Sequence, residues 1–147
     1  MQHDNDLPTL ELAFPGPERD QGVAAILDGH KTALTGLPEI YEHAREPLPT
    51  PGQRFAVLDS AGRTAVTIEL TEVRVVAMRE IDDAFAHAEG RGYTDATQWR
   101  TAHQEFFRSP GVSAFLGHTP TIDDDTPIVA QRFRTLTTPH TPQPATP

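Results

Sequence analysis

The chain has 147 residues, which suits one domain, and its 37% hydrophobic and 22% charged content is typical of a globular protein. It contains no cysteine, which excludes disulfides, thiol catalysis and thiolate metal sites. The net charge is −9, from 21 acidic and 12 basic residues. This balance argues against nonspecific coating of long nucleic acids, which needs a basic surface, but it allows a local basic groove.

The sequence shows no sign of a membrane or secreted protein. No stretch approaches the roughly 20 apolar residues of a membrane span. Residues 1–6 are polar and acidic, unlike the start of a signal peptide. We therefore expect a cytoplasmic protein with no membrane partner.

The first predicted elements are a weakly alternating strand over residues 7–15 and a helix over residues 18–28. Apolar residues at helical spacing support the helix, and Gly29 is a natural C-terminal stop. Residues 30–37 are predicted to form a loop, and a short helical turn follows over residues 39–44.

The strongest β signal lies in the middle of the chain. Residues 46–52 contain three prolines and cannot form a helix. A strand over residues 54–59, a turn over 60–62 and a long strand over 64–76 predict a β-hairpin. The long strand alternates between apolar and polar residues, as expected for an antiparallel strand with one buried face.

The second half of the chain is predicted to be mostly helical before a last strand. A helix over residues 82–89 ends at a glycine-rich break, and another covers residues 96–108 with Asp95 as its N-cap. A final strand covers residues 127–136. Strands and helices without regular βαβ alternation predict an α+β fold. We divide the chain into a flexible N-terminus (1–8), a folded domain (9–136) and a disordered Pro/Thr-rich tail (137–147).

Metal binding is not predicted. The seven histidines show neither HxH nor HExxH spacing, and we expect His103 to pack on the helix that carries Trp99. Trp99 itself should be central to the core. The acidic run Asp123–Asp125 lacks the Gly and Glu of an EF-hand loop, so we interpret it as a solvated loop. No cofactor is expected.

Seven blocks of sequence follow one another in an order that is similar to the ASCH domain family. They are Gly29-His30-Lys31-Thr32, Tyr41-Glu42, Glu46-Pro47-Leu48-Pro49 with Gly52, Ile68-Glu69-Leu70-Thr71-Glu72-Val73, Glu89-Gly90-Arg91-Gly92, Trp99-Arg100 with His103, and Arg132-Phe133. The resemblance runs from about residue 9 to 136. It implies a small PUA-like β-barrel with flanking helices and a cleft around the Gly29–Thr32 loop.

The resemblance also suggests chemistry. Members of this family have been linked to RNA binding, to RNA cleavage and to deacylation of N4-acylcytidine-type nucleosides. In the deacylating members the proposed site combines a Lys, a Thr three residues later and a Glu from the glycine-flanked loop. Lys31 and Glu89 match, but Leu34 stands at the hydroxyl position, Thr35 comes one place late, and Arg91 stands where relatives often carry a second Glu.

Lys31 is also the one lysine among 12 basic residues, the other 11 being Arg. A compact ammonium can fill a role that a planar guanidinium cannot. We expect Glu69 or Glu89 within salt-bridge reach of it, and of the two we favour Glu89.

Three functional hypotheses follow. In the leading one, the cleft binds a nucleoside, nucleotide or short RNA, with absent or altered catalysis; Tyr41 and Tyr93 are predicted to lie in loops, where they could stack on bases. The alternatives are a hydrolase of the amidohydrolase or ribonuclease type that uses Lys31, Thr35 and Glu89, and a protein-interaction domain. The residues expected to contact a ligand in the leading hypothesis are Gly29, Lys31, Thr32, Tyr41, Glu69, Arg91 and Tyr93.

Overall fold

The structure is a computed structural model, and it describes residues 7–136. The predicted tail and most of the predicted flexible N-terminus lie outside the described residues. The α+β class is confirmed. The elements are, in chain order, β1 (Thr9–Glu11), α1 (Pro17–Asp28), β2 (Ala33–Gly36), α2 (Pro38–Ala44), β3 (Arg54–Leu58), β4 (Thr64–Ala77), the 3₁₀ helix η2 (Met78–Glu80), α3 (Asp83–Ala88), α4 (Ala96–Phe107), α5 (Pro110–Leu116) and β5 (Pro127–Thr135).

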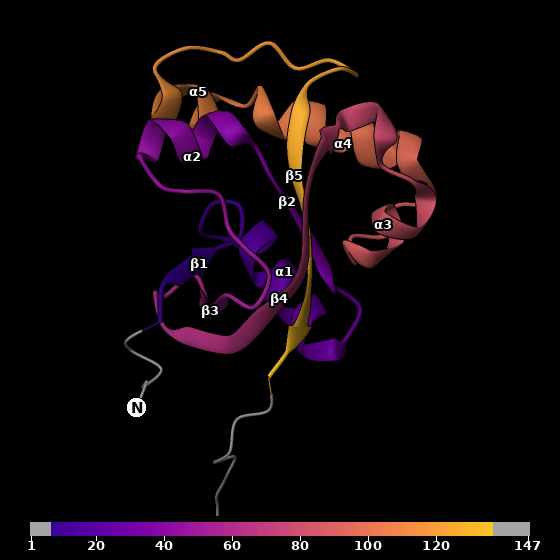
Figure 1. Cartoon of the computed structure of the whole chain (residues 1–147). Helices are drawn as coiled ribbons and strands as arrows, with labels where there is room; N and C mark the ends of the chain where they lie inside the picture. The colour runs from indigo at the N-terminus through magenta and orange to yellow at the C-terminus, as the bar shows by residue number, and fades with distance from the viewer. Residues whose placement is uncertain (1–6, 137–147) are drawn as a thin grey trace, which may run out of the picture.

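The strands form one mixed sheet in the order β1-β3-β4-β5-β2. β1 pairs with β3 in parallel, and the other neighbouring strands are antiparallel. The long strands β4 and β5 run through the middle of the molecule (Figure 1). Within residues 7–136, β1 and β2 are edges that do not pair with each other, so the sheet is open rather than the closed barrel that the resemblance implied.

Each face of the sheet is covered by its own hydrophobic cluster. Val23 and Ile26 of α1 pack on one face, and Phe85 of α3 and Trp99 of α4 pack on the other. Side chains alternate between the faces of a strand, so neighbouring residues of β2 and β5 serve different clusters. Leu34 belongs to the α1 side, whereas Ala33 belongs to the side of α3 and α4.

Most helix boundaries follow from local signals in the sequence. Gly29 ends α1 in a left-handed conformation with φ 85°, as predicted. Asp95 is the N-cap of α4, accepting a hydrogen bond from the backbone N–H of Gln98 at 2.9 Å. No helix within residues 7–136 is long and apolar enough to cross a bilayer.

Two elements differ from the sequence analysis. Residues 30–37 were predicted to be a loop, but Ala33–Gly36 form the edge strand β2. A four-residue strand is too short to show a clear alternation, and it is defined by its antiparallel pairing with β5. Helix α5 was not predicted at all, although Ser109 as N-cap and Pro110 at the first helical position are recognisable start signals.

Trp99 occupies the centre of the core, as expected. Its side chain is fully buried and meets the Phe85 ring edge-on at 6.4 Å. Replacing Trp99 with Ala should lower the free energy of unfolding by roughly 3–5 kcal/mol, because it leaves a large cavity. Urea denaturation measures this, with Leu27→Ala as a control at a 60% exposed position on α1. Equal losses in the two variants would contradict the core assignment.

Candidate functional site

A cavity of about 870 Å³ lies beside the edge strand β2. Its wall is formed by the segment 10–15, the start of α1, β2 with the start of α2, the loop after α3, α4 and α5. Among the predicted site residues, Lys31, Thr35, Tyr41, Glu89, Arg91 and Tyr93 line this cavity. We therefore take it as the candidate functional site.

Lys31 reaches the cavity wall because the chain turns sharply after α1. The left-handed Gly29 allows the backbone N–H groups of His30 and Lys31 to bond the carbonyl oxygen of Ala25. The Lys31 side chain is then buried, with 5% of its surface exposed. Its ammonium donates to the Glu89 carboxylate oxygen Oε1 at 3.0 Å and to the Glu89 backbone carbonyl at 3.2 Å. The expectation that Glu89 pairs with Lys31 is thus met.

Glu89 is the centre of the site. Its carboxylate is buried and faces four side chains. Lys31 contacts Oε1, while Thr35 Oγ1 donates to Oε2 at 2.5 Å and Trp99 Nε1 donates to Oε2 at 3.2 Å. His103 Nε2 lies 3.5 Å from the same Oε2. The site therefore gathers a carboxylate, an ammonium, a hydroxyl, an indole and an imidazole.

The surroundings of Glu89 determine its charge. Burial alone would raise the pKa of this carboxyl, because desolvation disfavours the ionised form. The adjacent Lys31 ammonium, together with His103 and the Thr35 hydroxyl, outweighs burial and holds the pKa well below its usual range. Glu89 is consequently a carboxylate across the physiological pH range.

The hydroxyl of the site comes from Thr35 and not from position 34. Leu34 packs into the cluster beneath α1, while Thr35 points across the sheet edge to Glu89. Consecutive residues of a strand face opposite sides, so only one of the two can reach the carboxylate. Thr35 stands one residue after the hydroxyl position of the family pattern, but β2 directs its side chain to Glu89 all the same.

Gly90 allows the loop after α3 to approach Lys31. It has φ 70°, and a Cβ there would lie 2.7 Å from the His30 carbonyl oxygen and 2.8 Å from Lys31 Cα. No side chain fits in that space. Gly92 in the same loop has φ 84°, but a Cβ there would meet no atom within 4 Å. Gly90 is therefore required because a side chain would clash with the backbone of His30 and Lys31, whereas Gly92 is required only for its left-handed backbone conformation.

Trp99 and His103 belong to the site as well as to the core, which sequence reasoning missed. The His103 ring stacks on the Trp99 ring, with centroids 4.3 Å apart. His103 Nδ1 lies 2.9 Å from the Trp99 carbonyl oxygen, which only accepts hydrogen bonds, so Nδ1 carries a hydrogen. The other ring nitrogen, Nε2, faces Glu89, and it donates to the carboxylate only when the ring is protonated. The signal in the sequence was the spacing of Trp99 and His103. Both rings carry a nitrogen that can hydrogen-bond, and a separation of four residues puts them on the same face of a helix.

Two tyrosines stand at the side of the cavity. Tyr41 lies in α2, which matches the helical turn predicted over residues 39–44 and corrects the placement of this tyrosine in a loop. Its hydroxyl accepts a hydrogen bond from Gln131 at 3.3 Å. A Cβ at Gly36 would meet this hydroxyl at 2.7 Å, so Tyr41 packs directly over the residue after Thr35. Burial raises the pKa of Tyr41, and burial together with the Glu89 charge raises that of Tyr93.

Three of the predicted ligand residues do not line the cavity. Gly29 forms the left-handed turn after α1, and the backbone of Thr32 bonds Ala88 and Phe133. Glu69 lies on β4, where it pairs with Arg54 at 3.3 Å and Arg134 at 2.5 Å. Its role in the described structure is to join β4 to its neighbouring strands.

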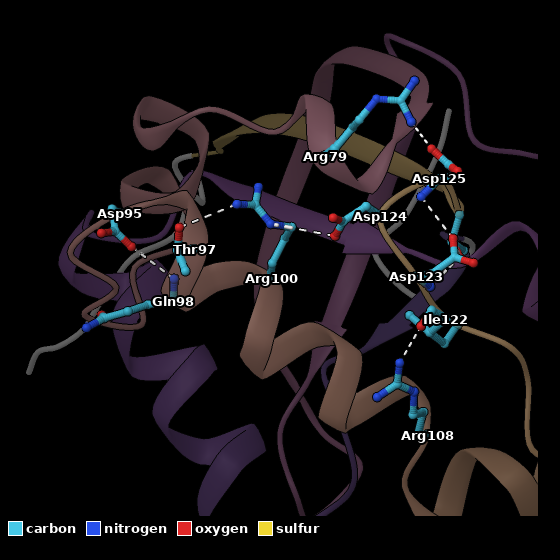
Figure 2. Close-up of polar contacts among 11 residues, drawn as sticks. Arg79, Asp95, Thr97, Gln98, Arg100, Arg108, Ile122, Asp123, Asp124 and Asp125 are labelled. Atoms are coloured by element: carbon cyan, nitrogen blue, oxygen red, sulfur yellow. Dashed lines mark hydrogen bonds and ion pairs between the residues drawn. The ribbon is translucent and has the colours of Figure 1, made fainter.

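The acidic run Asp123–Asp125 lies outside this cavity and is engaged by arginines. Figure 2 shows Arg79 directed at Asp125 and Arg100 at Asp124, the latter pair 3.9 Å apart. Within residues 7–136 no group of three or more acidic or histidine side chains is arranged to hold a metal ion.

The close approach at Gly90 makes a testable prediction. Gly90→Ala should destabilise the protein by several kcal/mol and displace Glu89 from Lys31, because backbone atoms occupy the space of the new methyl group. Gly92→Ala is the matched control: it should cost only about 1–2 kcal/mol, for its left-handed backbone. Thermal and urea unfolding compare the two, and equal losses would contradict the steric argument.

The low pKa of Glu89 predicts a pH dependence of stability. The folded pKa lies below the unfolded value of about 4.3, so the stabilisation is complete above that value and is lost as the pH falls below it. Wild type should therefore be more stable than Glu89→Gln at pH 5, and the difference should shrink towards pH 3. Denaturant unfolding of both proteins at each pH tests this; a constant difference would contradict it.

Comparison with known proteins agrees with the fold. The family model of the ASCH domain matches residues 11–137. A crystal structure of an ASCH domain from Lactobacillus crispatus JV V101 is 24% identical with a TM-score of 0.75, covering 88% of this chain and 79% of that chain. A protein from Enterococcus faecalis V583 is 24% identical with a TM-score of 0.76, covering 88% of this chain and 76% of that chain. No curated protein matches significantly. Because the family match spans most of its length, the chain belongs to the ASCH domain family.

Proposed function

We propose that the protein is an amidohydrolase that removes the acyl group from a nucleoside of the N4-acylcytidine type. One observation carries this proposal: the Thr35 hydroxyl donates a hydrogen bond to Glu89 at 2.5 Å, on the wall of a cavity large enough for a nucleoside. A hydroxyl bonded to a carboxylate is the arrangement of a nucleophile next to its base. The chemistry inferred from the family resemblance uses the same residue types, a Thr and a Glu together with a Lys, which is Lys31 here.

In the proposed reaction, one proton passes from Thr35 to Glu89 and then to the leaving amino group. Thr35 Oγ1 attacks the acyl carbon of the substrate amide while Glu89 takes the hydroxyl proton. The bond from the acyl carbon to N4 then breaks, and the leaving amino group receives that proton. Water hydrolyses the resulting ester of Thr35, which restores the hydroxyl and releases the carboxylic acid.

Lys31 is placed to stabilise the negative charge that forms during attack. An ammonium has three N–H donors, and in the described structure two of them bond Glu89. The third is free to bond the oxygen of the acyl carbonyl as it becomes an oxyanion. A fixed charge in a site with little water stabilises such an oxygen strongly.

The charges of the cavity favour a nucleoside over a nucleotide or RNA. Each Lys or Arg side chain of its wall already contacts a carboxylate: Arg19 with Glu11 at 3.2 Å, Lys31 with Glu89 at 3.0 Å, and Arg91 with Glu18 at 3.7 Å. Glu105 adds a further negative charge to the wall. A phosphate would therefore meet paired cations and additional carboxylates, in a chain of net charge −9.

A second candidate, binding without catalysis, is favoured by the polar groups that already surround Glu89. Its two oxygens already face an ammonium, a hydroxyl, an indole and an imidazole. With its pKa held well below the usual range, the carboxylate is a weak base. In this candidate, Lys31 and Glu89 shape a site that recognises a nucleoside and leaves it unchanged.

Incubation with N4-acetylcytidine separates the two candidates. We expect cytidine and acetate as products, with kcat/KM lowered at least about 100-fold in Thr35→Val and Glu89→Gln. Thr101→Val, at an exposed position of α4 outside the cavity wall, is the control and should keep full activity. Circular dichroism and melting temperatures verify that each variant is folded.

Lys31 variants complete the experiment. Lys31→Ala removes the charge, whereas Lys31→Arg keeps it in a larger planar group that does not fit a buried site built around an ammonium. Both should reduce turnover. Calorimetric binding of intact N4-acetylcytidine without turnover would instead support the binding candidate, and neither binding nor turnover would favour a protein-interaction domain.

A further inference from the structure

Part of the cavity wall is apolar, and two of its side chains are more exposed than is usual for large hydrophobic residues. Phe14 and Phe115 are 44% and 48% exposed, and both line the cavity. We call this part of the wall the apolar lobe. It consists of Phe14, Leu37, Ile40, Phe106, Val112 and Phe115. Clustered exposed apolar residues inside a cavity indicate a surface that a ligand covers.

The apolar lobe is continuous with the proposed reactive residues along one wall formed by β2 and α2. Thr35 is followed in the chain by Leu37 and Ile40, which also line the cavity. α2 lies beside α5 (Figure 1), where His43 contacts the Phe115 ring with centroids 4.9 Å apart. This wall leads from the hydroxyl to the exposed Phe115.

α4 provides the second connection. His103 faces Glu89, and Phe106 lies one helical turn further along the same helix, also in the cavity wall. The Phe106 ring packs against Phe14 with centroids 5.6 Å apart. Both walls therefore pass from the polar groups around Glu89 to the apolar lobe.

The position of Phe14 is built into the fold. A Cβ at Gly111 would lie 2.5 Å from Cζ of the Phe14 ring, so only glycine at the start of α5 allows this ring to lie where it does. The ring is thus held between α4 and α5 while 44% of Phe14 stays exposed. An aromatic side chain that is positioned but not covered is suited to contact a flat apolar group.

We propose that the apolar lobe holds the acyl group of the substrate, and that the preferred substrates carry a large apolar acyl group, such as benzoyl, rather than acetyl. This inference rests on the proposed function. Thr35 must lie next to the acyl carbon, and the apolar lobe starts beside Thr35, so the chain of the acyl group extends into it. The polar groups around Glu89 and Arg91 are left to contact the nucleoside.

The test compares N4-acetylcytidine with N4-benzoylcytidine. Wild type should hydrolyse the benzoyl compound with a kcat/KM at least about tenfold higher, since each additional apolar group buried in a pocket contributes about this factor. In Phe115→Ser the ratio of the two kcat/KM values should fall at least fivefold. The control Leu27→Ser, at a 60% exposed position outside the cavity wall, should leave the ratio unchanged. Equal kcat/KM values for the two compounds, or a ratio that Phe115→Ser does not change, would overturn the inference.

A binding measurement distinguishes failure of this inference from failure of the proposed function. If neither compound is hydrolysed, the proposed function fails, and the apolar lobe is judged by calorimetry alone. Tighter binding of N4-benzoylcytidine that weakens in Phe115→Ser would still support the lobe as the site of the acyl group. Equal affinities would refute it, as would a wild-type dimer that becomes a monomer in Phe115→Ser, because the lobe would then be a protein interface.

Discussion

The buried ion pair between Lys31 and Glu89 is the interaction on which the site depends. Two charges withdrawn from water are stable only when their geometry and their remaining hydrogen bonds compensate the lost hydration. The fold meets this requirement with further polar contacts to Glu89 from Thr35, Trp99 and His103. Removing either charge would leave the other buried without an opposite charge, so the elements that carry Lys31 and Glu89 are constrained to keep the pair together.

The same pair joins parts of the molecule that are distant in sequence. Lys31 follows α1, whereas Glu89 ends α3, and Trp99 and His103 belong to α4. Trp99 links the hydrophobic core directly to the polar site, because its rings fill the centre of one cluster while its indole N–H bonds the carboxylate. Packing of the core thereby determines the position of Glu89, and the role proposed for this carboxylate requires rigid support of this kind.

The cavity combines two surfaces with different chemistry. In its polar part each Lys or Arg side chain is paired with a carboxylate, and Glu105 adds a further negative charge, so this part is better suited to neutral polar ligands than to phosphates. The other part consists of aromatic and aliphatic side chains from α2, α4, α5 and the segment before α1. The proposed ligand, an acylated nucleoside, likewise has a polar part and an apolar part.

The sequence by itself determined the features that depend on neighbouring residues. Gly29 as a helix stop, Asp95 as an N-cap and the alternation of β4 were all predicted, because caps and periodicity are local properties. So was the pairing of Lys31 with Glu89, on the strength of the family resemblance. The tertiary structure decided the rest. Ala33–Gly36 is a strand only because β5 lies beside it, and this strand turns Leu34 into the core and Thr35 to the site. Trp99 and His103 reach Glu89 only through the packing of α4 against α3, a contact that no local pattern of residues contains.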